Sequence, residues 1–264
     1  MHNNRKSLLD VRNLKVIFKN TNALAINDIS FYLKPREIFA IVGESGSGKT
    51  SIALSIANLF NRKTIEISGH ILFDDTDLLT ISEKEMASYR GSQIMYIFQE
   101  PNLALNPSLT IGYQILESMK SKSKSDVIDL MRDVGLMNRS TYHSYPHELS
   151  GGMQQRAMIA VALASNPKLL IADEPTTSLD VTIQKQIIDL LKTIHEKREL
   201  AILLITHNLG IVNGFADRVM VILNGKIEEI SNVETIFKNP KSPYTAKLLA
   251  CIPEVGNPNK LIPK

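Results

Sequence analysis

The chain has 264 residues, of which 44% are hydrophobic and 22% charged, as expected for one large globular domain or for a core with a subdomain. Its net charge of +3 is too small to indicate a strong field for nucleic acid or for an anionic membrane. Its one cysteine, Cys251, excludes an internal disulfide and a cysteine-based zinc or iron–sulfur site.

The N-terminal part of the chain predicts antiparallel strands. It starts with polar residues, and no apolar run approaches 18 residues, so we expect neither a signal peptide nor a membrane span. Residues 9–18 and 25–33 alternate between apolar and polar side chains and are separated by a turn cluster. Phe18 could stack on an adenine ring or pack in a core like any strand aromatic, and the residues alone leave both open.

A glycine-rich segment follows the apolar run 37–42, which predicts a buried strand, and precedes a predicted helix over 51–59. It fits G-x-x-x-x-G-K-[ST] with Gly43, Glu44, Ser45, Gly46, Ser47, Gly48, Lys49 and Thr50. Its backbone N–H groups can surround an anion, Lys49 can contact the β- and γ-phosphates, and Thr50 can ligate Mg²⁺. The alternative is a glycine-rich turn with an incidental lysine, which the flanking strand and helix argue against. The segment therefore predicts a nucleoside triphosphate site.

The middle of the chain predicts a helical subdomain inserted into an α/β core. A strand over 69–74 and a capping box at 82–85 come first. A buried strand over 93–98 then ends at Gln99, where ligands bind in α/β sheets, although a lone glutamine is ordinarily just a polar strand end. A proline-punctuated loop at 100–107 leads into helical periodicity from 110 to 164, with a polar linker at 120–125.

A second candidate anion site opens the last helix of that block. Residues 149–156 read Leu-Ser-Gly-Gly-Met-Gln-Gln-Arg and precede an apolar-faced helix that ends at Asn166-Pro167. Ser150 is a suitable N-cap, and Gly151 and Gly152 would let a phosphate approach the N–H groups at the positive end of the helix. A plain capping turn is the alternative.

Two further predicted strands end in residues that can take part in catalysis, at the same edge of the sheet. The strand over 169–174 ends in Asp173, which can hold Mg²⁺, and Glu174, which can activate water as a general base. A strand over 201–206 delivers His207, where we expect a γ-phosphate contact although lone histidines are usually structural. A turn at 178–180 before a helix over 182–198, an Asn-Gly hairpin within 219–229, and a short helix with an extended tail complete the chain.

Taken in this order, these motifs resemble an ATP-binding cassette (ABC) ATPase, the nucleotide-binding subunit of a transporter, over nearly the whole chain. The resemblance implies a single cassette at 1–264, an α/β P-loop NTPase (RecA-like) core with an N-terminal antiparallel β subdomain and an inserted helical subdomain. The core with its β subdomain would comprise 1–99 and 166–238, the helical signature subdomain 100–165, and a C-terminal extension 239–264.

The resemblance also implies a role for each motif. Glu174, His207 and Gln99 would be catalytic, and Thr50, Gln99 and Asp173 would hold Mg²⁺. Two cassettes would bind head to tail, with ATP between them. The ATP of one subunit would contact Phe18, Gly43, Glu44, Ser45, Gly46, Ser47, Gly48, Lys49, Thr50 and Ser51. The signature Leu149, Ser150, Gly151, Gly152, Met153 and Gln154 would complete the site of the opposite subunit, with the D-loop Ser178, Leu179 and Asp180 at the dimer interface.

Finer features resemble the ATPases of oligopeptide, dipeptide and nickel importers, namely residues 98–101 with 105–107, 145–153 and 239–245. These importers usually pair two unequal ATPases. Gly-Gly-Met at 151–153 and residues 171–177 resemble the first ATPase of such a pair. This implies a second homologous ATPase in a heterodimer, two transmembrane permeases and an extracytoplasmic binding protein. The chain would lie at the cytoplasmic face of the membrane, use ATP and Mg²⁺, and bind no nucleic acid.

Two departures and three alternatives accompany this resemblance. Asn208 follows His207 where the family usually has aspartate, and no C-terminal cysteine cluster is present, so we expect no iron–sulfur cluster. The resemblance implies an ATPase that powers an importer of di- or oligopeptides. A nickel or metal-chelate importer is the alternative, and the absent cluster is a slight argument for it. A soluble ABC protein of DNA repair or translation lacks support, since the chain has neither a coiled-coil insertion nor a second cassette. A module that binds ATP without hydrolysis is disfavoured by Glu174.

Overall fold

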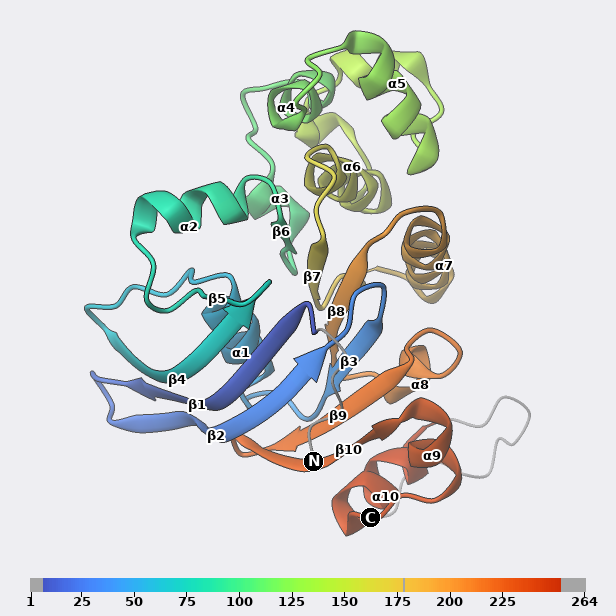
Figure 1. The fold of residues 1–264 in the computed structure, drawn as a ribbon. Helices are drawn as coiled ribbons and strands as arrows, with labels where there is room; N and C mark the ends of the chain where they lie inside the picture. The colour runs from blue at the N-terminus through green and yellow to red at the C-terminus, as the bar shows by residue number, and fades with distance from the viewer. Residues whose placement is uncertain (1–6, 178, 253–264) are drawn as a thin grey trace.

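The computed structural model describes residues 7–177 and 179–252, which form two β-sheets flanked by helices (Figure 1). The smaller sheet has the strand order β2-β1-β4-β5 and the larger one β10-β9-β3-β8-β7-β6. The fold is mixed α/β with a parallel core, as the sequence predicts.

The smaller sheet is antiparallel, as expected from the alternating pattern. It comprises β1 (Leu9–Phe18), β2 (Ala23–Leu33), β4 (Ile65–Phe73) and β5 (Thr76–Asp77). The prediction that β4 starts at Gly69 is wrong, because that glycine lies within the strand. Its φ of +102° and its close approach to Asn13, where the register with β1 shifts, identify a β-bulge and not a turn.

The larger sheet is parallel apart from its last strand. It comprises β3 (Ile38–Val42), β6 (Ile94–Ile97), β7 (Leu169–Asp173), β8 (Ala201–Thr206), β9 (Arg218–Leu223) and β10 (Lys226–Asn232). Every residue of β3, β7 and β8 is buried, which explains their uninterrupted apolar sequences. The β9–β10 hairpin turns through Asn224 and Gly225, both with positive φ, as a type I′ turn requires.

Strand β6 differs from the prediction of a buried strand ending at Gln99. It lies at the edge of the larger sheet and ends at Ile97, and among the strands of residues 7–177 and 179–252 it pairs with β7 alone. The edge position leaves Met95 and Tyr96 half-buried. Gln99 therefore lies two residues beyond the strand, in the segment that leads to the helical region.

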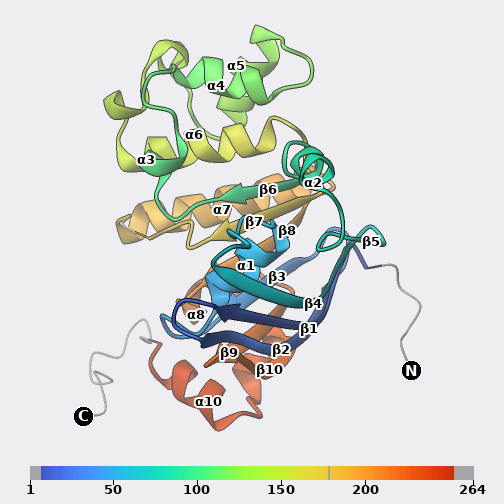
Figure 2. The ribbon, with the colours of Figure 1, turned by 90° about the vertical axis from the view of Figure 1, so that its left-hand side faces the viewer.

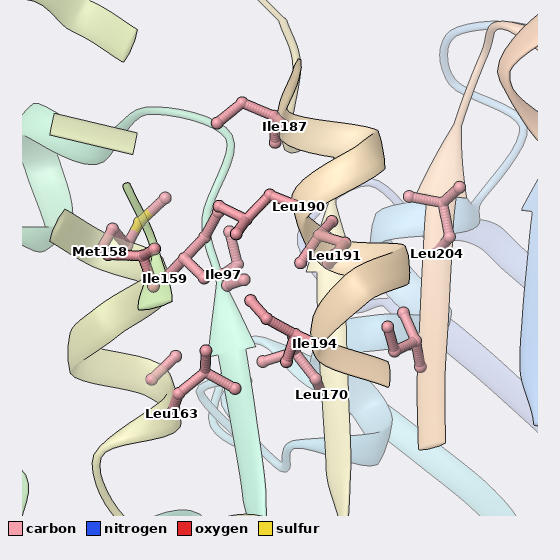
Figure 3. Close-up of a cluster of buried hydrophobic side chains, with 14 of the residues drawn as sticks. Ile97, Met158, Ile159, Leu163, Leu170, Ile187, Leu190, Leu191, Ile194 and Leu204 are labelled. Atoms are coloured by element: carbon pink, nitrogen blue, oxygen red, sulfur yellow. The ribbon is translucent and has the colours of Figure 1, made fainter. Parts of the chain in front are cut away.

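Helices cover both faces of the larger sheet. On one face, α1 (Lys49–Ile56) packs between the two sheets, and α2 (Glu83–Arg90) begins with the predicted capping box of Ser82 and Glu85. On the other face, α6 (Gly151–Leu163) and α7 (Val181–Lys197) pack on the strands. Figure 3 shows this second core, in which apolar side chains of both helices meet those of β6, β7 and β8. Helix α1 begins two residues earlier than predicted, so Lys49 and Thr50 belong to its first turn.

Residues 101–163 form a group of helices beyond the edge of the sheet (Figure 2). The group comprises α3 (Pro101–Ala104), α4 (Ile111–Ser118), α5 (Lys124–Asp133), α6, and the 3₁₀ helices η1 (Arg139–His143) and η2 (Pro146–Glu148). Two predictions here are wrong in detail. The loop at 100–107 contains α3, because Pro101 suits a first helical position, and the linker at 120–125 ends inside α5, which Ser123 caps.

The C-terminal part carries three short helices, α8 (Leu209–Val212), α9 (Val233–Lys238) and α10 (Pro243–Ala250). From residue 239 on the sequence predicts one short helix and an extended tail, and α10 is that helix. The residues of the tail from 253 on lie outside the described part of the chain. Among the described helices, none combines the length and apolar character needed to cross a bilayer.

Candidate functional site

The carboxyl ends of β3, β7 and β8 meet at one edge of the larger sheet and border a cavity of about 740 Å³. Because parallel strands end together, the residues that follow each strand converge there. The cavity is lined by Phe18, Ala25, Gly43, Glu44, Ser45, Gly46, Gly48, Lys49, Thr50, Ser51, Gln99, Glu174, Thr177, His207 and Leu248. The structure thus brings together the predicted residues of five separate segments.

The glycine-rich loop is closely packed on its outer side. A Cβ at Gly43 would lie 2.2 Å from the carbonyl oxygen of Ile222, and Gly48 has a φ of +104° with Ala25 behind it. Only glycine suits either position. By contrast, Gly46 has open space where a Cβ would lie, and it lines the cavity. The loop therefore presents its backbone to the cavity, as an anion site requires.

The buried Lys49 ammonium spans this loop. Its Nζ donates to the carbonyl oxygens of Gly43 and Glu44, each at 2.8 Å. Burial lowers the pKa of Lys49, whereas the carboxylates of Glu174 and Asp173 raise it. A phosphate in the cavity would offer the ammonium anionic partners that compensate for burial better than two carbonyl groups do.

Ser47 is the one residue of the predicted ATP-contacting segment that does not line the cavity. Its side chain is buried and turned toward Gly43, and its hydroxyl has no hydrogen-bond partner in the described part of the chain. The other predicted members, Phe18 included, border the cavity. The Phe18 ring is half-buried and packs edge-to-face with the Phe60 ring, with the two ring centroids 6.2 Å apart.

Asp173 lies buried at the end of β7, beside α1. Its Oδ1 accepts a hydrogen bond from the Thr50 hydroxyl at 3.3 Å, and its Oδ2 accepts one from the Tyr96 hydroxyl at 2.6 Å. Burial raises the pKa of Asp173, while hydrogen bonds from Tyr96 and Thr50 oppose that rise. Burial also raises the pKa of Tyr96 far above its ordinary value, so its hydroxyl remains a donor.

The residues present fit a magnesium ion bound together with phosphates. The Thr50 hydroxyl lines the cavity and lies beside the buried Asp173 carboxylate, which is not itself part of the cavity lining. Within residues 7–177 and 179–252, no group of three or more His, Cys, Asp or Glu residues forms a complete metal site. Two protein oxygens suit Mg²⁺, which usually combines one or two protein ligands with substrate phosphates and water.

Glu174 follows β7 and faces His207 across the cavity edge. Nδ1 of His207 lies 2.9 and 2.8 Å from the two oxygens of Glu174, and the Thr177 hydroxyl donates to Oε2 at 3.1 Å. Glu174 has a φ of +49°, a conformation that non-glycine residues adopt rarely. Because a carboxylate only accepts hydrogen bonds, Nδ1 carries the proton and Nε2 of a neutral His207 is left as an acceptor.

The signature residues do not join this cavity. They lie at the start of α6, where Ser150 and Gly151 are exposed and Gly152, Met153 and Gln154 are half-buried, whereas Leu149 is buried. Ser150 occupies the N-cap position as predicted, but its hydroxyl makes no capping hydrogen bond. Of the D-loop residues, Asp180 caps α7 by accepting from the N–H of Ile183, Leu179 approaches Gly151, and Ser178 lies outside the described residues.

Sequence reasoning missed five residues at or beside this site, namely Ala25, Tyr96, Thr177, Tyr244 and Leu248. Tyr244 and Leu248 lie one turn apart on α10, and the Tyr244 hydroxyl accepts a hydrogen bond from the N–H of Glu44 at 3.4 Å. No local pattern marks four of these positions. Thr177 is the exception, because the Thr-Thr pair that follows Glu174 and Pro175 could have indicated a hydroxyl close to that carboxylate.

Comparison with known proteins agrees with this geometry. A family model described as ABC transporter matches residues 26–177. The chain is 46% identical over 257 residues to the oligopeptide transport ATP-binding protein OppD of Bacillus subtilis, covering 93% of this chain and 72% of that protein. It is 43% identical over 258 residues to OppD of Lactococcus lactis subsp. cremoris, covering 94% of this chain and 76% of that protein.

Solved structures agree as well. The dimeric ATP-binding cassette MJ0796 bound to ADP and Pi has a TM-score of 0.75 at 25% identity, covering 85% of this chain and 98% of that one. The protein cbiO1 of Clostridium perfringens, part of the ABC transporter complex cbiONQ, has a TM-score of 0.77 at 26% identity, with 89% and 92% covered. The glycine-rich loop, the acidic strand end and His207 thus lie in a fold shared with ATP-binding cassettes. The chain therefore belongs to the ABC transporter family, as an ATP-binding cassette with ATPase activity.

Proposed function

We propose that this cassette powers an importer for di- or oligopeptides by hydrolysing ATP at the sheet edge. The observation that supports hydrolysis is the cavity itself, where the P-loop, Glu174 and His207 face a common space. The observation that supports a peptide cargo is the resemblance to relatives described as oligopeptide transport ATP-binding proteins. The cargo is selected elsewhere, because no residue of this site discriminates peptides from metal chelates.

In the proposed reaction the P-loop holds the triphosphate and Glu174 activates water. Lys49 leaves the carbonyl oxygens of Gly43 and Glu44 for the β- and γ-phosphates. Glu174, ionised beside His207, accepts a proton from the water that attacks the γ-phosphorus. The bond from the γ-phosphorus to the β–γ bridging oxygen breaks, and ADP leaves with that oxygen. His207 contacts the γ-phosphate through Nε2–H when its imidazole carries both ring protons, with Nδ1–H still on Glu174, and the amide of Gln99 is available for the attacking water. Phe18 provides a ring against which adenine stacks.

Thr50 and Asp173, with Gln99 at the cavity wall, would hold the magnesium ion. When bound, this ion supplies positive charge that stabilises the β- and γ-phosphate oxygens. Asp173 is suited to this role because it is buried within hydrogen-bond reach of Thr50, the first hydroxyl after the P-loop lysine.

We further propose that a second cassette completes the ATP site. The N-terminus of α6, with its exposed Ser150 and Gly151, carries unpaired N–H groups that attract phosphate. It lies apart from the cavity of its own chain, so it serves the partner's ATP in a head-to-tail dimer. Residues 100–165 act as the signature subdomain, and Asp180 lies at the interface. Hydrolysis then requires closure of the dimer, which positions the reactants.

The partners follow from the importer assignment. They are a second homologous ATPase in a heterodimer, two transmembrane permeases and an extracytoplasmic binding protein. The cassette lies peripherally at the cytoplasmic face of the membrane, and Gln99 couples it to the permeases. The exposed position of Gln99, at the base of the helical group, suits contact with both nucleotide and permease.

The test is uptake by cells that lack this chain, supplied with labelled di- and oligopeptides and, separately, with nickel. Wild type and Glu174→Gln are reintroduced in parallel. We expect peptide uptake to be lost, restored by wild type and not restored by the variant. Loss of nickel uptake alone would assign the same ATPase to a metal importer. Restoration of uptake by Glu174→Gln would disprove the catalytic role of Glu174.

A further inference from the structure

Tyr96 makes a short hydrogen bond to a residue of the proposed metal site. Its hydroxyl donates to Asp173 Oδ2 at 2.6 Å, across the boundary between β6 and β7. In this parallel pair Tyr96 is opposite Ile171, and Asp173 lies two residues beyond Ile171. Because side chains alternate along a strand, Tyr96 and Asp173 project from the same face as diagonal neighbours. The contact is therefore a consequence of strand register.

The two oxygens of Asp173 have different partners. While Oδ2 accepts from Tyr96, Oδ1 accepts from Thr50 at 3.3 Å. Asp173 is 5% exposed and Tyr96 is half-buried, so water is a poor substitute for the phenol. The shorter bond fixes the rotation of the carboxylate and thereby determines which oxygen faces Thr50.

We propose that Tyr96 is a positioning residue that orients Asp173 Oδ1 toward the cation shared with Thr50. The inference rests on the proposed function, in which Thr50 and Asp173 hold Mg²⁺. Outer hydrogen bonds to metal-binding carboxylates commonly fix their orientation and raise metal affinity. Tyr96 itself contacts neither nucleotide nor cation in this arrangement, and it does not line the cavity.

The same hydrogen bond anchors the segment that carries Gln99. The Tyr96 and Phe98 rings pack with their centroids 4.6 Å apart, and Gln99 follows Phe98 directly. Strand β6 is an edge strand that ends at Ile97, so within the sheet its C-terminal end is hydrogen-bonded on the β7 side alone. The hydrogen bond from Tyr96 to Asp173 therefore connects the end of β6 to the end of β7. The positions of Gln99 and Asp173 both depend on this hydrogen bond.

The test compares cation affinity in wild type and Tyr96→Phe, which removes only the hydroxyl. Mn²⁺ is the probe, titrated into protein with ADP while free Mn²⁺ is followed by electron paramagnetic resonance, with ADP alone as the blank. We expect about tenfold weaker Mn²⁺ binding in Tyr96→Phe. The affinity for ADP in EDTA should be unchanged, because the P-loop is intact. Tyr89→Phe is the matched control, since the Tyr89 hydroxyl donates to Thr76, outside the site.

Asp173→Asn separates this inference from the proposed metal site. If Asp173→Asn binds Mn²⁺ like wild type, the metal assignment itself fails. If Asp173→Asn weakens Mn²⁺ binding while Tyr96→Phe binds it like wild type, Tyr96 has no positioning role and the inference is overturned. Thermal unfolding establishes that each variant is folded at the assay temperature. Tyr96→Met, which fills similar space without a hydroxyl, replaces the phenylalanine variant if the latter unfolds.

Discussion

Nδ1 of His207 lies 2.8 Å from Oε2 of Glu174, although the two residues follow different strands of the sheet. The Glu174 side chain is 13% exposed and that of His207 is 62% exposed, so the buried carboxylate is the fixed partner. The Thr177 hydroxyl, three residues after Glu174, donates to the same Oε2 at 3.1 Å. Glu174 is thus oriented by two donors, the Nδ1–H of His207 and the Thr177 hydroxyl.

We predict that Glu174→Gln abolishes most ATP hydrolysis while ATP binding is retained. The amide keeps the shape and hydrogen bonds of the side chain but cannot accept a proton from water. A general base typically contributes 10²–10⁴-fold, so we expect a loss of about that size in kcat. The measurement is phosphate release by the assembled complex, beside titration with a fluorescent ATP analogue. Glu199→Gln, at an exposed carboxylate on the opposite end of β8, is the control. A kcat near wild type in Glu174→Gln would contradict the role.

We predict that Leu248→Ala weakens nucleotide binding although Leu248 lies outside every motif identified in the sequence. Its side chain lines the cavity, and Tyr244, one turn earlier on α10, contacts the P-loop through the N–H of Glu44. Removal of apolar contact worth about 1 kcal/mol should raise the Kd for ATP about fivefold. Lys247→Ala, an exposed neighbour on the same helix, should bind ATP like wild type. Equal affinities in the two variants would show that α10 is only adjacent to the site.

The sequence was sufficient to predict most of the site because its buried strands are short and uninterrupted. The apolar runs of β3, β7 and β8 identify the strands, and parallel strands necessarily bring Lys49, Asp173 and His207 to one edge. The glycine-rich segment then requires a ligand with negative charge. Each of these inferences uses only local pattern and sheet geometry.

The remaining features depend on contacts that local patterns do not encode. Tyr96 meets Asp173 only because β6 pairs with β7 in one particular register, and Leu248 reaches the cavity only because α10 folds back beside the P-loop. The predicted start of β4 at Gly69 is wrong because a glycine occurs both at strand ends and in bulges inside strands. The pairing of Glu174 with His207 likewise depends on a rare backbone conformation, which no sequence signal reveals.

We predict that Leu191→Ala destabilises the fold by about 2–5 kcal/mol, since removal of a fully buried leucine leaves a cavity. Leu191 lies on α7 within the core shown in Figure 3, beside Ile187 and Ile194. Urea unfolding gives the free energy directly. Leu59→Ala is the control, because Leu59 is 40% exposed, and it should cost much less. Similar losses in the two variants would mean that the core relaxes around the missing side chain.

We predict that Glu229 stabilises the fold at neutral pH and that this contribution disappears in acid. Its carboxylate is buried and accepts from the N–H groups of Lys241 and Ser242, at the start of α10. Burial alone would raise the pKa of Glu229, but these hydrogen bonds lower it below its ordinary value of 4.5. Since the folded pKa lies below the unfolded one, the contribution is complete above pH 4.5 and is lost as the pH falls through the folded pKa.

Glu229→Gln tests this linkage, because glutamine resembles the protonated carboxyl group and cannot titrate. At pH 7 the variant should be less stable than wild type by about 1.5–3 kcal/mol, the value of a hydrogen bond to a charged group. Toward pH 3 the two free energies of unfolding should converge, since wild type then carries a neutral Glu229. Glu234→Gln, in an exposed pair with Lys238, should show little difference at either pH. A difference between wild type and Glu229→Gln that stays constant with pH would mean that packing, and not charge, is what Glu229 contributes to the docking of α10.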